Sequence, residues 1–242
     1  MSKTILNIKN LEIGYKDPIT NVINLNAEEG NLVCIIGRNG VGKSTLLNTL
    51  SGILKPLSGD IFYNDINFPR LSSNERSRLI SYVPSRQEYV SNLNVYELVS
   101  MGRSPYTNMF DKHSTNDKDI IEKALIEFNL ENLQKKSLYE VSDGERQRAM
   151  ICRAIVQETP VILLDEPTAF LDYYAKQKLL FDLSVLVKEK NKCIIFSSHD
   201  LQLSVKYSEL VWLFHHNEVK SFTTNDLKNS GLLNELMNFE FN

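Results

Sequence analysis

The chain has 242 residues, enough for one large domain or for a domain that carries an inserted subdomain. Its 27 basic and 30 acidic residues give a formal charge of −3, so no global positive charge argues for a nucleic-acid partner. The three cysteines lie far apart in apolar or helical runs, which favours buried, reduced thiols and a cytoplasmic protein. No stretch approaches the roughly 18 apolar residues of a membrane span, and the N-terminus lacks the apolar core of a signal peptide.

Short strands are expected at the N-terminus. Residues 5–8 and 11–13 alternate between apolar and polar side chains, and Tyr15 follows where the second strand would end. An isolated tyrosine at such a place is more often part of the sheet surface than a stacking platform. The phosphate-binding pattern further along the chain favours stacking on a planar ligand.

A glycine-rich run follows the apolar stretch Leu32–Ile36, which predicts a buried strand, and it leads into a predicted helix at Ser44–Leu54. Its glycines let successive N–H groups face one anion, Lys43 brings charge to the β- and γ-phosphates, and the Ser44 hydroxyl can bind Mg²⁺. The alternative is an ordinary glycine turn before a helix. The run fits G-x-x-x-x-G-K-[ST] and consists of Gly37, Arg38, Asn39, Gly40, Val41, Gly42, Lys43, Ser44 and Thr45.

The pattern changes from strands to helices after this region. Asp60–Tyr63 and Ile80–Val83 predict strands, and Pro84 ends the second. Val95–Met101 and Asp117–Leu130 then show helical periodicity. We therefore expect a helical subdomain between two parts of a core.

The expected unit is a single domain over residues 1–242. Its nucleotide-binding core comprises residues 1–84 and 142–242, and the inserted helical subdomain comprises about 85–141. Residues 102–116 form a polar, proline-containing loop within that insertion.

A capping pattern opens the second part of the core. Ser142 is followed three residues later by Glu145, which has the form of a capping box, and the helix is expected to run to about Gln157. A cap alone is a sufficient structural explanation for these two residues.

Two carboxylates, Asp165 and Glu166, follow directly on the apolar run Val161–Leu164, which predicts a buried strand. Adjacent carboxylates at the end of such a strand are costly unless they bind something. Ligands of open α/β sheets lie at that edge. We expect the pair to act on Mg²⁺ and water.

His199 lies just past the next predicted strand, Cys193–Ser197, and a helix is expected before it at Tyr173–Lys190. A lone histidine after a strand is usually structural or solvated, but its place beside a third strand end makes His199 a catalytic candidate. The tail Phe222–Asn242 predicts a short amphipathic helix and leaves no room for an appended regulatory domain.

The order of these motifs resembles the nucleotide-binding subunit of ATP-binding cassette (ABC) transporters over essentially the whole chain. The resemblance implies an α/β P-loop NTPase cassette that uses ATP and Mg²⁺, with a mainly parallel core sheet, an N-terminal antiparallel β part and an inserted α-helical subdomain. Five motifs carry it: the P-loop at 37–45, the signature position at 141–145, the Walker B strand ending in 165–168, the D-loop at 170–172 and the switch His199.

The resemblance also implies roles in nucleotide binding. Tyr15 would stack on adenine, while Lys43 and the backbone of residues 37–45 would hold the phosphates. Ser44 and Asp165 would hold Mg²⁺, Asp165 through water.

For hydrolysis, it implies that Glu166 is the general base on the attacking water and that His199 contacts the γ-phosphate. Ser142 and Gly144, at a helix N-terminus, would bind the γ-phosphate of ATP held by a second copy. The functional unit would therefore be a homodimer in its ATP-bound state.

The signature position departs from the family pattern. The usual Leu-Ser-Gly-Gly-Gln is Val-Ser-Asp-Gly-Glu here, so Asp143 and Glu145 add negative charge near a phosphate site. Because Ser142 and Gly144 remain, we expect binding to persist.

The Q-loop departs as well. The family's glutamine normally follows Tyr-x-Pro, but here Ser85 occupies that place and Gln87 lies two residues further on. Both residues remain candidates for the sensor that signals to the helical subdomain.

The stretch Glu97–Tyr106 looks like the Glu-Leu-Val-x-x-Gly-Arg-x-Pro segment of importers for iron chelates (siderophores), haem and cobalamin. Since this segment faces the permease, it does not name the cargo, and a plain helix with a proline turn is the alternative. We expect an ATPase that energises such an importer from the inner face of the cell membrane, with permease subunits and, indirectly, a substrate-binding protein as partners. The cassette ATPase of iron–sulfur cluster assembly is the alternative function.

Overall fold

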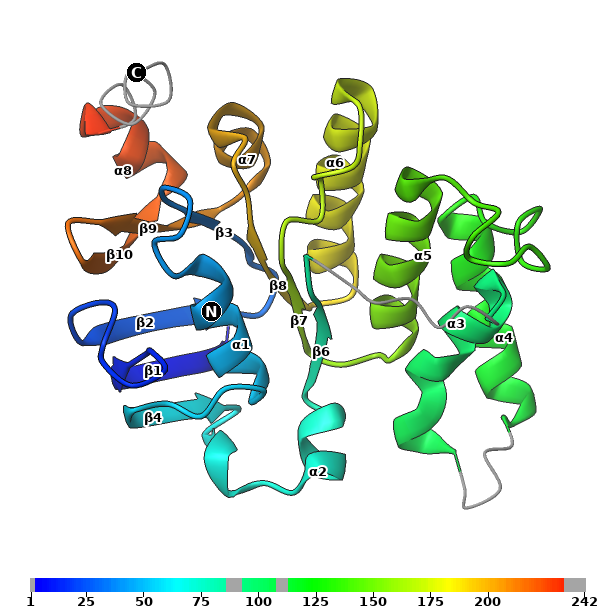
Figure 1. Ribbon diagram of the computed structural model, residues 1–242, viewed down its shortest axis with the longest axis horizontal. Helices are drawn as coiled ribbons and strands as arrows, with labels where there is room; N and C mark the ends of the chain where they lie inside the picture. Colours follow the sequence, from blue (N-terminus) through cyan, green and yellow to red (C-terminus); the bar gives the residue numbers. More distant parts are fainter. Residues whose placement is uncertain (1–2, 86–92, 108–112, 233–242) are drawn as a thin grey trace.

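The computed structural model describes residues 3–85, 93–107 and 113–232, which form two β-sheets with flanking helices (Figure 1). The strands are β1 (Thr4–Glu12), β2 (Ile23–Glu28), β3 (Leu32–Ile36), β4 (Ser58–Tyr63), β5 (Ile66–Asn67), β6 (Ile80–Val83), β7 (Val161–Leu164), β8 (Cys193–Ser197), β9 (Leu210–His215) and β10 (Glu218–Thr223). The helices are α1 (Lys43–Ser51), α2 (Ser73–Ser77), α3 (Val95–Ser100), α4 (Thr115–Glu127), α5 (Asp143–Val156), α6 (Tyr173–Glu189), α7 (Leu201–Tyr207) and α8 (Thr224–Asn229), with 3₁₀ turns η1 (Phe68–Arg70) and η2 (Met101–Tyr106).

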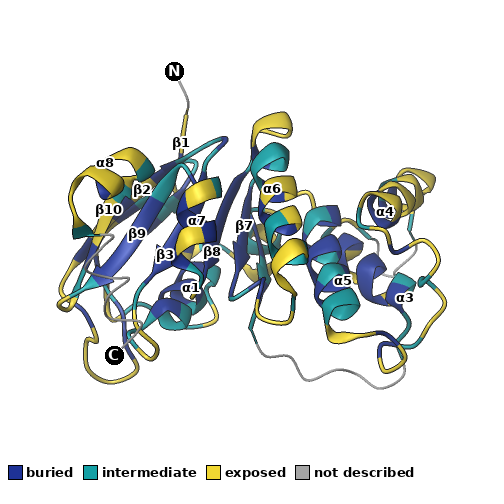
Figure 2. Cartoon of the chain, turned by 90° about the horizontal axis from the view of Figure 1, so that it is seen from above, coloured by how far each residue is buried: buried dark blue, intermediate teal, exposed yellow. Residues whose placement is uncertain are grey.

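The larger sheet has the strand order β10-β9-β3-β8-β7-β6, and all neighbours are parallel except the edge pair β10–β9. Every residue of β3, β7 and β8 is buried, as expected for parallel strands covered on both faces. The mainly parallel core sheet is therefore confirmed, and Figure 2 shows its strands as the buried centre of the molecule.

Alternate side chains of β3 belong to two separate hydrophobic cores. Leu32, Cys34 and Ile36 pack with helices α5, α6 and α7, whereas Val33 and Ile35 pack with α1 and the smaller sheet. This division follows from the two-residue period of a strand. The parallel sheet is thus the middle layer of the core.

The smaller sheet is antiparallel, with the order β2-β1-β4-β5. The two predicted N-terminal strands form one strand, β1, which bends where Asn10 takes a positive φ of 48° and the pairing register shifts. The N-terminal antiparallel β part is confirmed. Its strand β2 was absent from the sequence-based prediction.

Several predicted boundaries change because local capping ends or starts the helices. Helix α1 stops at Ser51, since Gly52 adopts φ 80° and donates its N–H to the Thr49 carbonyl. Helix α4 begins earlier than predicted, after the Ser114 cap. The tail prediction was wrong at its start, because Phe222 lies in β10 and α8 follows; residues 233–242 lie outside the described part.

The helices α3, α4 and η2 gather at one end of the molecule, where they pack on α5 (Figure 1). Helix α5 also contacts β6 and β7, so it joins this helical region to the parallel sheet. Within the described ranges, no helix combines the length and apolar character that a membrane span requires.

Candidate functional site

The glycine-rich run connects β3 to α1 and needs glycine where its backbone is crowded or twisted. A Cβ on Gly42, whose φ is 115°, would lie 2.4 Å from Ile19 Cδ1, and a Cβ on Gly37 would lie 2.7 Å from Phe214 Cβ. At Gly40, with φ 75°, the corresponding space holds no atom within 4 Å. The loop is therefore packed on one side and open on the other, with the N-terminus of α1 at its end, which suits a phosphate group.

Lys43 lies folded against this loop and is only 5 % exposed. Its Nζ donates to the carbonyl oxygens of Gly37, at 2.8 Å, and Arg38, at 3.1 Å. Burial lowers the pKa of Lys43, and the carboxylates of Glu166 and Asp165 partly oppose that effect. A cation thus stands in the loop, facing the two carboxylates.

Asp165 and Glu166 follow β7, next to the end of the neighbouring strand β8. The Ser197 hydroxyl donates to Asp165 Oδ1 at 2.6 Å and accepts the backbone N–H of Glu166 at 2.8 Å. Ser197, which is fully buried, therefore orients both acidic residues. The sequence-based prediction missed it, although its place at the end of a strand beside the Walker B strand was a usable signal.

Glu166 has a left-handed backbone conformation with φ 51°, an unusual value for a residue with a side chain. Its Oε1 lies 2.5 Å from His199 Nε2. The Glu166 side chain is 28 % exposed and that of His199 45 %. Both remain open to a ligand, and strain of this kind is concentrated at functional sites.

Glu166 and His199 line the same pocket as the glycine-rich loop. The pocket thus combines a phosphate-type loop with a carboxylate and an imidazole. Its lining comprises Asn39, Gly40, Gly42, Lys43, Ser44, Thr45, Glu166 and His199.

The residues expected to hold Mg²⁺ fit that ion. Ser44 belongs to the pocket lining, whereas Asp165 does not; Asp165 is 2 % exposed, and the Ser197 hydroxyl anchors its carboxylate. Mg²⁺ commonly takes one or two protein oxygens and completes its shell with water and phosphate oxygens. Among the described residues, no group of three or more acidic, histidine or cysteine side chains is arranged so that it could hold a metal ion by itself.

Tyr15 lies beside the loop rather than in the pocket lining. Its side chain is 75 % exposed, in the connection between β1 and β2. Ile19 of the same connection packs against Gly42, so an exposed aromatic ring stands on a segment that contacts the phosphate loop. This placement is compatible with stacking on a base.

Ser142 and Gly144 lie at the start of α5, and neither lines the pocket described above. The capping box predicted for Ser142 and Glu145 is present. A Cβ on Gly144 would lie 3.2 Å from Leu171 Cδ2, so the signature position and the D-loop are neighbours.

Only one of the two Q-loop candidates can be placed. Ser85 is half-buried, just after Pro84 at the end of β6, and Gln87 lies outside the described residues. A groove runs beside this segment between α1, α2 and α5, and its walls include Ile53, Arg76 and Arg153.

Within the Gly102–Tyr106 segment, which resembles part of an importer motif, Arg103 forms a buried junction between helices. Arg103 is 4 % exposed and its guanidinium binds Asp117 at 2.8 Å, Glu158 at 2.7 Å and the Val156 carbonyl at 2.7 Å. Tyr106 lies against the same guanidinium, 4.3 Å from ring centroid to Cζ. The segment ties η2 and α4 to the C-terminal end of α5.

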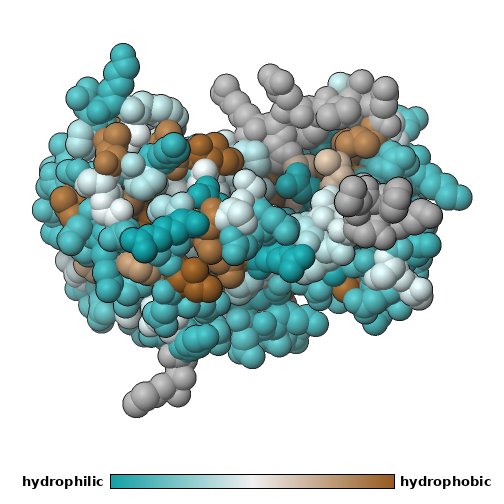
Figure 3. Space-filling model, turned by 90° about the horizontal axis from the view of Figure 1, so that it is seen from below, coloured by the Kyte–Doolittle hydropathy of each residue, from teal (hydrophilic) through white to brown (hydrophobic). Residues whose placement is uncertain are grey.

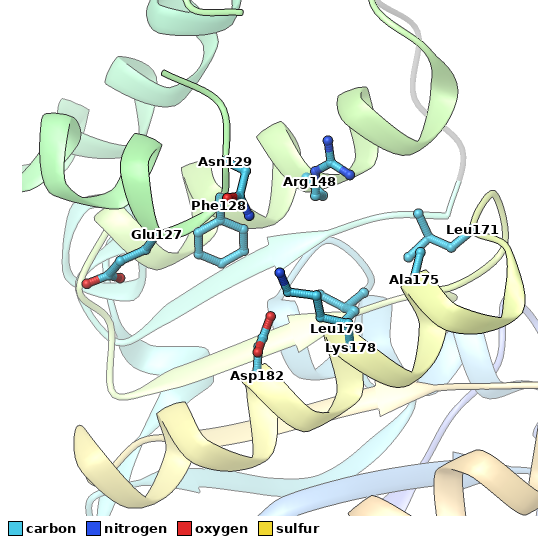
Figure 4. A pocket seen from close by; sticks show the side chains of 9 residues that line it. All are labelled: Glu127, Phe128, Asn129, Arg148, Leu171, Ala175, Lys178, Leu179 and Asp182. Carbon is cyan, nitrogen blue, oxygen red and sulfur yellow. The ribbon is translucent and has the colours of Figure 1, made fainter. Parts of the chain in front are cut away.

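A second cavity lies between the helical region and α6 (Figure 4). Lys178 and Asp182 of α6 face Phe128 and Asn129 beyond α4, and Leu171 of the D-loop lines its other end. The cavity shares no lining residue with the phosphate-loop pocket.

Known proteins share this combination of motifs. The model of the ABC transporter family matches residues 20–169 of the chain. The chain belongs to the ABC transporter family. The iron(3+)-hydroxamate import ATP-binding protein FhuC of Bacillus subtilis is 34% identical over 204 residues, which cover 84% of this chain and 76% of that protein. The petrobactin import ATP-binding protein FpuD of Bacillus anthracis is 32% identical, with 84% and 75% covered.

A solved structure supports the same assignment. A dimeric ATP-binding cassette in a post-hydrolysis state, bound to ADP and Pi, matches this cassette with a TM-score of 0.80 and 25% identity, and the match covers 91% of this chain and 99% of that one. The predicted fold class is thereby confirmed. The cassette is an ABC-type ATP hydrolase.

Proposed function

We propose that this cassette binds and hydrolyses MgATP to power a membrane importer of iron–siderophore complexes. The observation that carries the ATPase mechanism is the Glu166–His199 pair, 2.5 Å apart, over the phosphate loop. The names of the two import relatives support the class of cargo. No comparison specifically favours haem or cobalamin as cargo, or the iron–sulfur assembly alternative.

In the proposed mechanism the loop backbone and Lys43 hold the β- and γ-phosphates, and Tyr15 stacks on adenine. Ser44 and Asp165 hold Mg²⁺, which when bound neutralises charge that develops on the phosphate oxygens. Glu166 accepts a proton from the attacking water. His199 holds one Glu166 oxygen and orients the water toward the γ-phosphate, which leaves the second carboxylate oxygen to act as the base.

The proposed active unit contains two copies of the chain. Ser142 and Gly144 lie at the start of α5 and not in the lining of the pocket that holds Lys43, and we assign them to the γ-phosphate of ATP held by a second cassette. The dimeric relative bound to ADP and Pi supports this arrangement. Within each copy we assign residues 1–84 and 142–242 to the nucleotide-binding core and about 85–141 to the helical subdomain.

We propose that the permease binds at the groove beside Ser85, which lies between α1, α2 and α5. Its walls offer an exposed apolar side chain, Ile53, together with Arg76 and Arg153. The face of the molecule in Figure 3 is mostly hydrophilic, with apolar patches set among polar side chains. A substrate-binding protein would then act on the far side of the permease.

Co-purification tests this function. A tagged chain, solubilised from its own membranes with detergent, is expected to recover an integral membrane permease, and siderophore-bound iron uptake should stop when the chain carries Glu166→Gln. Recovery with soluble scaffold proteins and no integral membrane partner would contradict the importer assignment. Uptake of haem or cobalamin, without uptake of siderophore-bound iron, would contradict the assigned cargo.

A further inference from the structure

The first turn of α5 carries two acidic residues that depart from the family's signature pattern, and their environments differ. Asp143 Oδ1 pairs with Arg146 Nη1 at 2.6 Å. The same guanidinium donates to the carbonyl oxygens of Leu138, at 2.9 Å, and Val141, at 3.1 Å. Since these bonds hold Arg146 in place, the charge of Asp143 is compensated locally.

Glu145 has no cation within ion-pair distance among the described residues. Its Oε2 instead accepts two hydrogen bonds from Ser142, one from the backbone N–H at 2.8 Å and one from the hydroxyl at 2.9 Å. These bonds from Ser142 hold the pKa of the Glu145 carboxyl below its ordinary value, so it is ionised at neutral pH. An ionised carboxylate only accepts, and the Ser142 hydroxyl must therefore be the donor.

This contact matters because the hydroxyl of Ser142 has a single proton to donate. We propose that Glu145 is an internal competitor for the Ser142 hydroxyl, which the γ-phosphate of ATP must displace before the dimer closes. The inference rests on the proposed function, in which Ser142 binds ATP held by a second copy. A negative carboxylate at this helix end also repels the incoming phosphate, so closure needs a higher ATP concentration than it would with a neutral side chain.

The chain contains a matched control for this contact. The N-terminus of α2 has the same capping box, in which Glu75 Oε2 accepts the Ser72 N–H at 2.8 Å and the Ser72 hydroxyl at 2.6 Å. Glutamine also satisfies a capping box, so Glu145→Gln and Glu75→Gln keep both caps but replace the charged acceptor of the serine hydroxyl by a weaker, neutral one. The two variants differ in whether that charge lies at the proposed γ-phosphate site.

The test uses the full chain carrying Glu166→Gln, which slows hydrolysis so that the ATP-bound dimer accumulates. Light scattering after size-exclusion chromatography gives the MgATP concentration at half-maximal dimerisation. We expect Glu145→Gln to lower that concentration about two- to fivefold. Glu75→Gln should leave it unchanged, and both variants should bind MgADP to the monomer as the parent does.

Other outcomes separate this inference from the proposed function. If Ser142→Ala prevents dimerisation while Glu145→Gln changes nothing or raises the ATP requirement, the competitor role is wrong and the site in the second copy stands. Equal shifts in the two glutamine variants would also overturn the competitor role, because a general charge effect would explain them. If Ser142→Ala dimerises normally, the proposed site fails and the inference fails with it.

Discussion

The phosphate-loop pocket and the Arg103 junction are both rich in charged residues, but they use them in opposite ways. In the pocket, the side chains of Glu166 and His199 remain 28 % and 45 % exposed, and Glu166 has a left-handed backbone. At the junction, Arg103 is 4 % exposed and its partner Asp117 is buried with it, while Glu158 pairs with the same guanidinium from the surface. Charged groups that keep an open side are available for chemistry, whereas fully enclosed and paired groups fix the positions of helices.

The largest expected effect is on catalysis. Glu166→Gln should lower ATP hydrolysis by about 10²- to 10⁴-fold, because the water loses its general base. MgATP binding should persist, as measured by titration, and phosphate release gives the rate. Undiminished turnover in this variant would show that the open carboxylate is not the base. Glu75→Gln is the matched control and should hydrolyse ATP as the parent does.

At the Arg103 junction we expect a loss of stability and not of catalysis. Arg103→Met should lower the free energy of unfolding by about 3–5 kcal/mol, because Asp117 is left buried without its cation. Urea titration measures this loss. If the variant keeps its stability and loses only ATPase activity, the distinction between pocket and junction is wrong.

The pH dependence of stability provides a second test of the Arg103–Asp117 pair at the junction. Burial raises the pKa of Asp117, but hydrogen bonds from Ser114 and Arg103 outweigh it and hold the pKa below the ordinary 3.8. The carboxylate therefore stabilises the fold above pH 3.8, and this contribution is lost as the pH falls through the lowered folded-state value. We expect the stability difference between the parent and Arg103→Met to shrink in acid. A difference that stays constant down to acid pH would argue against this ion pair.

A smaller loss of ATP hydrolysis is expected from a change at Ser197, the buried residue that supports the two acidic residues. Ser197→Ala removes the donor to Asp165 Oδ1 and the acceptor of the Glu166 N–H. ATP hydrolysis should fall about 10- to 100-fold, because the groups that orient acidic site residues matter nearly as much as those residues. Ser198→Ala, which removes a bond to the Asp200 backbone, is the control and should have a much smaller effect.

The smallest effect is expected from Tyr106→Phe, which removes a 3.0 Å hydrogen bond from the tyrosine hydroxyl to the Gln157 carbonyl and keeps the ring against Arg103. The free energy of unfolding should fall by about 0.5–1.5 kcal/mol. The KM for ATP should not change, since Tyr106 lies outside the pocket lining. A changed KM would mean that the junction acts on the nucleotide site.

Much of the fold followed from pattern alone. The buried strands β3, β7 and β8 are continuous apolar runs, so their places were readable without a structure. Strand β2 was missed although its residues alternate between buried and exposed positions, which is the pattern of a half-buried strand. The helix-ending role of Gly52 depends on a backbone conformation that composition does not specify.

The sequence by itself determined the phosphate loop, the Walker B carboxylates and the signature cap, because each is a contiguous stretch whose chemistry depends on local spacing. Only the tertiary structure decided that Ser197 supports Asp165, since that contact spans 32 residues and requires β7 beside β8. The tertiary structure also showed that Arg103, which the sequence placed in an importer-like motif, is buried and binds Glu158, 55 residues away. Contacts between distant residues depend on which elements the fold brings together, and no local pattern records that.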